Sequence, residues 1–364
     1  MRRFLLFAAV LLLLSVPVLA SDVLSREADI LQTDTLYDGL DADASGLIGD
    51  ASPVQTDGFG ARLISMLYDV LADAEPGMRA ALQGGAGLLC IVLLCALASG
   101  IQTPFSDAAV RLAGALGITL ACAGSFGSMV QLADQTLARI DSYMTLLLPV
   151  LSSVLTAAGG VTSGGALYVG SCLFFDVLVR AIRMLLMPLV YAYLAMAAAE
   201  CAVGQERLLH IRELIGWVIS AALKGIMYLF TAYLAITGLV SGSADAATLK
   251  AAKAAFSGAV PVVGGIISDA SESVLAAAAI LKNSAGVFGM LAVAAIALAP
   301  FVRIGTEYLA MKLAAAVSGA FGASAHTKLL GALSSAMGYL LAMTGSAALM
   351  ALFSCTCFIR AVNG

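Results

Sequence analysis

Long apolar runs separated by short charged stretches occupy the chain from residue 84 onward. A membrane-spanning helix requires about 20 mostly apolar residues, and uninterrupted runs favour helices over β-barrel strands, whose apolar residues alternate. The pattern therefore predicts an all-α, polytopic integral membrane protein with about six to eight hydrophobic segments. In chain order these are residues 84–101, 112–133, 144–160, 166–199, 214–240, 284–302, 309–321 and 329–358.

The first 80 residues differ from this membrane domain, which we place at residues 81–364. Residues 1–20 combine a basic start, an apolar core and small residues before Ser21, which predicts a cleavable secretory signal peptide; an uncleaved first helix is the alternative. Residues 21–80 would then form an acidic extracytoplasmic arm. Its Asp- and Gly-rich part, 34–57, favours a flexible linker, whereas 59–71 has the apolar spacing of a short amphipathic helix.

Two places combine proline and glycine in a way that predicts broken helices. Pro149 precedes the small-residue run around Gly159 and Gly160, which favours a break and a re-entrant segment at 145–165. The more polar segment 242–283 carries a hinge and a capping aspartate, and these candidate residues are Pro261, Gly264, Gly265 and Asp269. Transporters place such breaks in corresponding positions of two repeats, but here the spacings differ.

Composition narrows the class of protein. Hydrophobic residues make up 61% of the 364 residues and charged residues 12%, about half the charged fraction of an average soluble domain, which excludes a soluble globular protein. Residues 21–80 hold 12 acidic and 3 basic side chains, a net charge of −9, and the remainder from 81 is slightly basic. Scattered basic residues give no indication of nucleic-acid binding.

Charged residues inside apolar runs need an explanation, because each is costly to insert unless it is paired or hydrated. Asp176, Arg180 and Arg183 share one helix face, and the order of the first two favours an intrahelical pair. Lys224 lies within another apolar run, and Asp176 is one candidate partner. Two interpretations are open for this candidate intramembrane cluster: a lock between helices, or part of a path for a solute or ion.

No set of residues with catalytic spacing is present in the sequence. There is no phosphate-binding loop, zinc-protease motif or nucleophile elbow. The seven cysteines lie in or beside apolar runs, and the pair Cys355-x-Cys357 has no histidine or acidic neighbours to complete a metal site. We therefore predict that the protein is not an enzyme and has neither a cofactor nor a metal site.

Orientation follows from the distribution of basic residues. With the arm outside and a re-entrant 145–165, the charged loop 200–213 lies in the cytoplasm, as do Arg303 and Arg360. If 145–165 crossed fully, that loop would lie outside instead.

Two blocks carry a family resemblance: LLLPVLSSVLTAAGGVTSGGALY at 146–168, and AVPVVGGIISDASESVLAAAAILKNSAGVFG at 259–289. Together with the arm and the order of helices, they resemble the stage III sporulation protein AE family over essentially the whole chain. The elements PVVGG-x-x-SDA and KN-x-x-G are the specific ones; the Ala- and Leu-rich spans are not. This chain departs from the family in its Ala- and Gly-rich spans and its short arm.

The resemblance implies a multi-pass protein of the mother-cell membrane around the forespore. There it would join other membrane proteins of the same sporulation operon and a forespore membrane partner in a secretion-like channel complex required for endospore development. Its N-terminal arm would be extracytoplasmic, and no catalytic residues carry over. The competing hypothesis is a self-contained secondary transporter or permease for a small solute, suggested by the broken segments and the membrane charges.

The orientation is testable by cysteine accessibility. In a cysteine-free background, single cysteines replacing Thr162 and Arg207 should react with an impermeant reagent from outside and from the cytoplasm, respectively, because 145–165 does not cross the bilayer. The reverse labelling pattern would contradict this topology.

Overall fold

The structure is a computed structural model that describes residues 34–49, 59–100, 104–157, 161–236, 284–321 and 324–363. Helices form almost all of this described part, and it contains no strand. Residues 1–20, the Gly159–Gly160 pair and the polar segment 242–283 with Pro261, Gly264, Gly265 and Asp269 fall outside the described residues, so the predicted signal peptide and hinge stay predictions.

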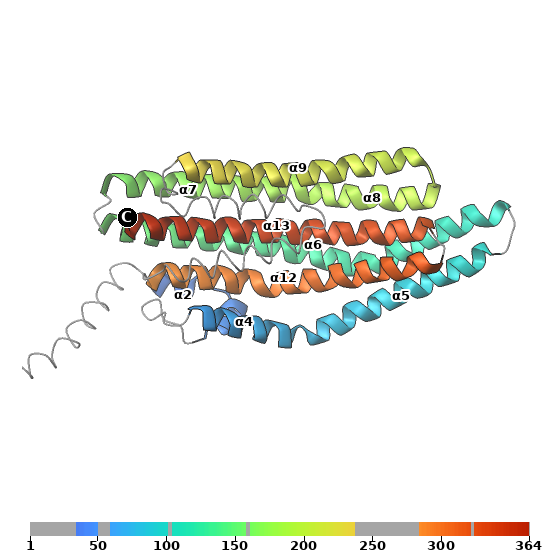
Figure 1. Ribbon diagram of the computed structural model, residues 1–364, viewed down its shortest axis with the longest axis horizontal. Coiled ribbons are helices and arrows are strands. Elements are labelled where there is room, and N and C mark those ends of the chain that lie inside the picture. Colours follow the sequence, from blue (N-terminus) through green and yellow to red (C-terminus); the bar gives the residue numbers. More distant parts are fainter. Residues whose placement is uncertain are drawn as a thin grey trace, which may run out of the picture.

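The helices are arranged as long, roughly parallel rods (Figure 1). In the described part of the chain, the short helices α2 and α3 and the amphipathic helix α4 precede long rods that run alternately in opposite directions (Figure 1). The elements are α2 (Asp34–Asp38), α3 (Ala42–Ile48), α4 (Phe59–Asp73), α5 (Glu75–Ser99), α6 (Pro104–Ala157), α7 (Val161–Ala181), the π-helical turn η1 (Ile182–Leu186), α8 (Met187–Val203), α9 (Glu206–Ile236), α12 (Ser284–Ser318), the 3₁₀ turn η2 (Gly319–Phe321) and α13 (Ser324–Asn363).

Helix α13 lies at the centre of the bundle, in contact with α6, α8, α9 and α12 (Figure 1). Its sequence is apolar on nearly every side, as is typical of a helix surrounded by other helices. Its inner side chains are fully buried and include Met337, Leu340, Met343 and Met350. Small residues allow other rods to approach closely. At Gly85 of α5, an added Cβ would lie 3.5 Å from the Ala310 carbonyl oxygen of α12.

Among the described residues, five helices are long and apolar enough to cross a membrane: Glu75–Ser99, Asp107–Leu151, Glu206–Leu234, Gly286–Phe321 and Ala325–Thr356. The predicted long helix 166–199 forms as α7 and α8, with the π-helical turn between them and Pro188 in the first turn of α8. The π-helical turn lies directly before this proline, with the Met187 N–H donating to the Ile182 carbonyl, and it accommodates a residue without a backbone donor inside one continuous rod.

Two predicted boundaries inside the rods are wrong. Helix α6 runs for 54 residues and joins the predicted second span to residues 144–157, so Pro149 does not end a helix. The buried neighbours Leu147, Leu148 and Leu151 hold this turn in place despite the missing backbone donor. Likewise, α12 passes through Pro300 and joins the predicted segments 284–302 and 309–321.

The course of α12 and α13 also corrects the predicted orientation of two arginines. The α8–α9 turn lies at one end of the bundle, whereas the C-terminal part of α13, which carries Arg360, lies at the other (Figure 1). Arg303 lies near the middle of α12. The three sites therefore do not share one end, because α12 and α13 each run as a single uninterrupted rod.

The arm is more ordered than its composition predicts. The amphipathic helix expected at 59–71 is present as α4, and α2 and α3 form within the segment predicted to be a flexible linker. Leu36, Ala44 and Ile48 are buried against the bundle. Asp41 caps α3 by accepting a hydrogen bond from the Ala44 N–H at 2.9 Å, and it also forms an ion pair with Arg139 of α6.

Helix α9 offers a matched test of close packing. A Cβ at Gly216 would lie 2.7 Å from the Tyr339 hydroxyl and 3.2 Å from the Tyr193 ring, whereas a Cβ at Gly225 would meet nothing within 4 Å. We expect Gly216→Ala to cost about 1–3 kcal/mol through overpacking. Gly225→Ala should be neutral or stabilising, because alanine favours helix over glycine. Thermal unfolding in detergent measures both, and equal midpoints for the two variants would contradict the packing described.

Candidate functional site: ion pairs and an acidic cavity

Charged residues of α6, α7 and η1 form a cluster on the side of the bundle. Arg183 of η1 donates two hydrogen bonds to Asp134 of α6, from Nε to Oδ1 at 2.7 Å and from the second guanidinium nitrogen to Oδ2 at 2.9 Å. Arg180 donates from Nε to Asp176 Oδ1 at 2.9 Å within α7. The bidentate geometry joins two helices and is the stronger arrangement.

The four candidate residues of the predicted intramembrane cluster do not all interact with one another. The intrahelical pair of Asp176 and Arg180 is present, but Arg183 bonds to Asp134, which the sequence reading did not propose as a partner. Lys224 is half-buried and takes part in no ion pair among the described residues, so Asp176 is not its partner. The sequence did contain an indication that Asp134 could be this partner. It is a charged residue directly after the apolar run 112–133, in the rod that precedes the one carrying the arginines.

The cluster lies at the surface of the bundle. The Arg180 side chain is 62% exposed, and Leu173, Val177 and Met184 beside it on the same rod are also exposed. The cost of inserting unpaired charges predicts a face that points into the protein or into an aqueous cavity, whereas the structure places this face at the bundle surface. The outward position follows because α7 turns its other side, with Phe175, Leu178 and Val179, into the core.

A second set of charges is buried at the α8–α9 hairpin and was missed by sequence reading. Arg212 of α9 bonds to Glu200 of α8 at 2.7 Å and to the Tyr193 hydroxyl at 3.0 Å, and the two charged side chains are only 14% and 12% exposed. The Tyr193 ring meets Tyr339 of α13 edge-on at 5.4 Å. Gly204, in the left-handed conformation with φ of 72°, ends α8 and allows the tight turn that brings the pair together.

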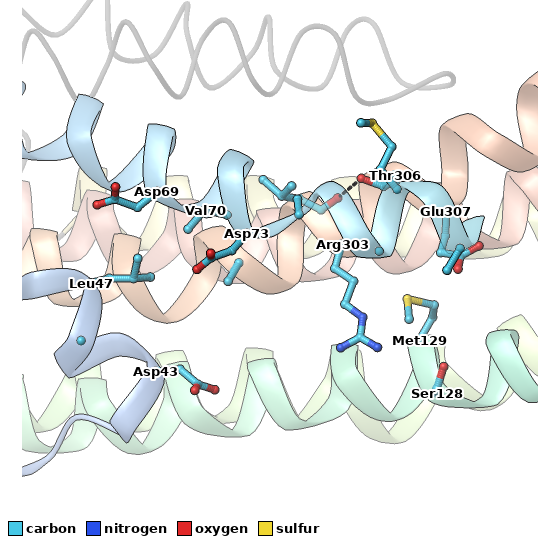
Figure 2. Close-up of a pocket in the computed structure, with 17 residues that line it drawn as sticks. Asp43, Leu47, Asp69, Val70, Asp73, Ser128, Met129, Arg303, Thr306 and Glu307 are labelled. Atoms are coloured by element: carbon cyan, nitrogen blue, oxygen red, sulfur yellow. Dashed lines mark hydrogen bonds between the residues drawn. The ribbon is translucent and has the colours of Figure 1, made fainter. Parts of the chain in front are cut away.

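An acidic cavity of about 720 Å³ opens between the arm and the rods α6 and α12 (Figure 2). Asp43 comes from α3, Asp69 and Asp73 come from α4, and Glu307 comes from α12. Arg303 points into the same space and is the one basic side chain of its lining. The cavity therefore favours cationic groups.

Metal binding has no support in the described part of the chain. No group of three or more His, Cys, Asp or Glu side chains there is arranged to hold a metal ion. In the described part of the chain, Cys90, Cys95, Cys122 and Cys201 are free thiols.

The described residues define an all-helical chain with five candidate membrane-spanning helices, in which ion pairs connect α6 to η1 and α8 to α9. A family model described as Stage III sporulation protein AE matches residues 63–362. The chain belongs to this family, which confirms the resemblance seen in the sequence. Stage III sporulation protein AE of Bacillus subtilis (strain 168) is 22% identical over 280 residues, covering 76% of this chain and 70% of that protein. No solved structure matches the chain.

The two ion pairs should differ in their effect on stability. Asp134→Asn and Arg183→Gln should each lower the amount of folded protein, and the double variant should recover part of that loss because no unpaired charge remains. Asp176→Asn and Arg180→Gln should change stability little, since exposed i, i+4 pairs contribute about 0.3–0.5 kcal/mol. Membrane abundance and unfolding midpoints in detergent measure this contrast. If substitutions in the two pairs changed abundance and midpoint equally, the link between α6 and η1 would not be the source of the stability difference.

Proposed function

We propose that the protein is a membrane subunit of the transenvelope, secretion-like channel complex between mother cell and forespore. It would act with other membrane proteins of the same operon and with a forespore membrane partner. Membership of the stage III sporulation protein AE family supports a role in sporulation. The family is not known for enzymatic activity, and the described ion pairs have structural geometry.

One observation favours an assembly subunit over a self-contained transporter: a charged side chain is exposed midway along the rod formed by α7, η1 and α8. The Arg180 side chain is 62% exposed and lies beside the exposed apolar residues Leu173, Val177 and Met184. A charge facing lipid at the centre of a helix costs about 2.5–3.5 kcal/mol by insertion scales. A lone transporter needs an unbroken apolar surface where lipid surrounds it, whereas a subunit can cover such charges with other proteins or hold them in water.

Length supports the same proposal. At 1.5 Å per residue, the 54 residues of α6 extend about 80 Å, against about 30 Å for the hydrocarbon core of a bilayer. A large part of the bundle therefore lies outside the hydrocarbon. The arm helices α2 and α3 cover α6 and α12 with acidic residues, including Asp41 and Asp43. We infer that the half of the bundle beside the arm projects into the extracytoplasmic space, which here is the space between the two membranes.

The alternative, a secondary transporter or permease, keeps some support from Lys224, a half-buried cation without an ion-pair partner among the described residues. Transporters commonly place unpaired charges on solute paths. The densely packed core around α13 favours a rigid subunit instead.

Affinity purification from sporulating cells distinguishes the two. We expect the tagged chain to recover other membrane proteins of the sporulation complex, and the purified chain in liposomes to move no solute. An unrelated multi-pass protein with the same tag, expressed in the same cells, is the control. Solute transport by the isolated chain, with no protein recovered beyond the control, would establish the transporter instead.

A further inference from the structure

Helix α4 has two apolar faces, and only one of them packs against the described part of the chain. Met66 and Val70 are buried against the rest of the protein. Ile64, Leu67, Tyr68 and Leu71 form a second stripe at i, i+3, i+4 and i+7, which we term the α4 stripe, and all four are exposed, Tyr68 to 70%. Exposed apolar stripes of this kind typically mark interaction sites.

The stripe continues the direction of helix α5. The Ala74 N–H donates to the Val70 carbonyl at 2.9 Å and the Met78 N–H to the Ala74 carbonyl at 2.8 Å, so helical hydrogen bonds cross the junction. Pro76 lacks a backbone donor and accounts for the shallow bend between the two helices (Figure 1). The two helices therefore form one bent rod.

Lipid cannot cover the α4 stripe on this rod. Residues 80–99 carry no charge and extend about 30 Å, the thickness of the hydrocarbon core. Glu75 and Arg79 form an exposed ion pair at 2.6 Å directly before this run and mark its edge. Tyr68 lies eleven residues before Arg79, about 16 Å further along the rod, whereas the interfacial layer is about 5–7 Å thick.

Charge argues against a second copy of the chain as the cover. Each copy has a net charge of −9 over residues 21–80, so two arms that meet through α4 would repel one another. Helices that lie on anionic membranes carry Lys and Arg on their polar face, whereas α4 carries Asp69 and Asp73 with a single arginine, Arg62. A surface complementary to the α4 stripe is therefore apolar and carries basic residues beside the apolar part.

We propose that the α4 stripe docks a different protein subunit, one that presents an apolar helix face flanked by lysines or arginines. The proposal rests on the proposed function and deepens it by naming the surface and the chemistry of the partner. Tyr68 is the natural anchor of this contact, since tyrosine combines a large apolar ring with a polar tip and is enriched in protein interfaces.

Site-specific photo-crosslinking in sporulating cells tests the proposal. The photoreactive amino acid p-benzoylphenylalanine replaces Tyr68, and in a matched control it replaces Asp69, an exposed residue about 100° around the same helix from Tyr68 and outside the α4 stripe. We expect several-fold more adduct with another membrane protein at position 68 than at position 69. The crosslinked segment, identified by mass spectrometry, should be apolar with basic residues beside it. The further change Leu67→Ser should reduce the adduct at position 68.

Each other outcome overturns the inference. These outcomes are an adduct of twice the chain mass, an adduct with phospholipid, a crosslink within the chain, equal yields at both positions, or no adduct from a protein present at normal abundance. If the variant at position 68 does not accumulate, the same comparison at Leu71 replaces it. If the wild-type chain still recovers its partners while position 68 forms no adduct with them, this surface is wrong and the proposed function stands. If the wild type recovers no partner, the proposed function fails as well.

Discussion

The burial of α13 is the constraint on which the rest of the structure depends. An apolar helix of 40 residues has no polar side to turn to water, so its neighbours must enclose it. Helices α6, α8 and α12 meet this requirement with side chains that are themselves fully buried, such as Ile140, Val190 and Leu291. Because both α6 and α12 must follow α13 along its length, neither can stop at an internal proline.

The same constraint moves the charges outward. Once the inner sides of α6, α7 and α12 are committed to the core, Asp134, Arg180 and Arg303 have only the bundle surface left to occupy. Where two such charges come from adjacent elements, as in Arg183 and Asp134, they pair and fix the relative position of the elements. The Glu200–Arg212 pair is the exception, because it is buried. Arg212 donates hydrogen bonds to Glu200 and to the Tyr193 hydroxyl, which offset the cost of burying the two charges.

Helix class and most of the apolar segments could be predicted from the sequence, because hydropathy directly reports long apolar helices. The unbroken course of α6 and α12 could not be predicted in this way. Pro149 is a local signal for a break, and the burial of its neighbours Leu147, Leu148 and Leu151 against distant helices overrides this signal. The arm shows the opposite case: Asp34–Asp38 and Ala42–Ile48 have a linker's composition, but Leu36 and Ile48 find a surface on α12 and α6 that no local reading reveals.

The candidate site was predicted only as far as local spacing reaches. Asp176 and Arg180 are four residues apart, so their pairing follows from helix geometry alone. The partner of Arg183 lies 49 positions away, and its identity depends on how α6 and α7 align after they turn back on one another. That alignment is fixed by apolar packing rather than by the charges. The ion pair therefore reports the register of the bundle and stabilises it only after the core has formed. Among the described residues, Arg180 pairs only with Asp176 of its own helix, and its side chain stays 62% exposed, so a further subunit or water must cover the rest of the guanidinium group.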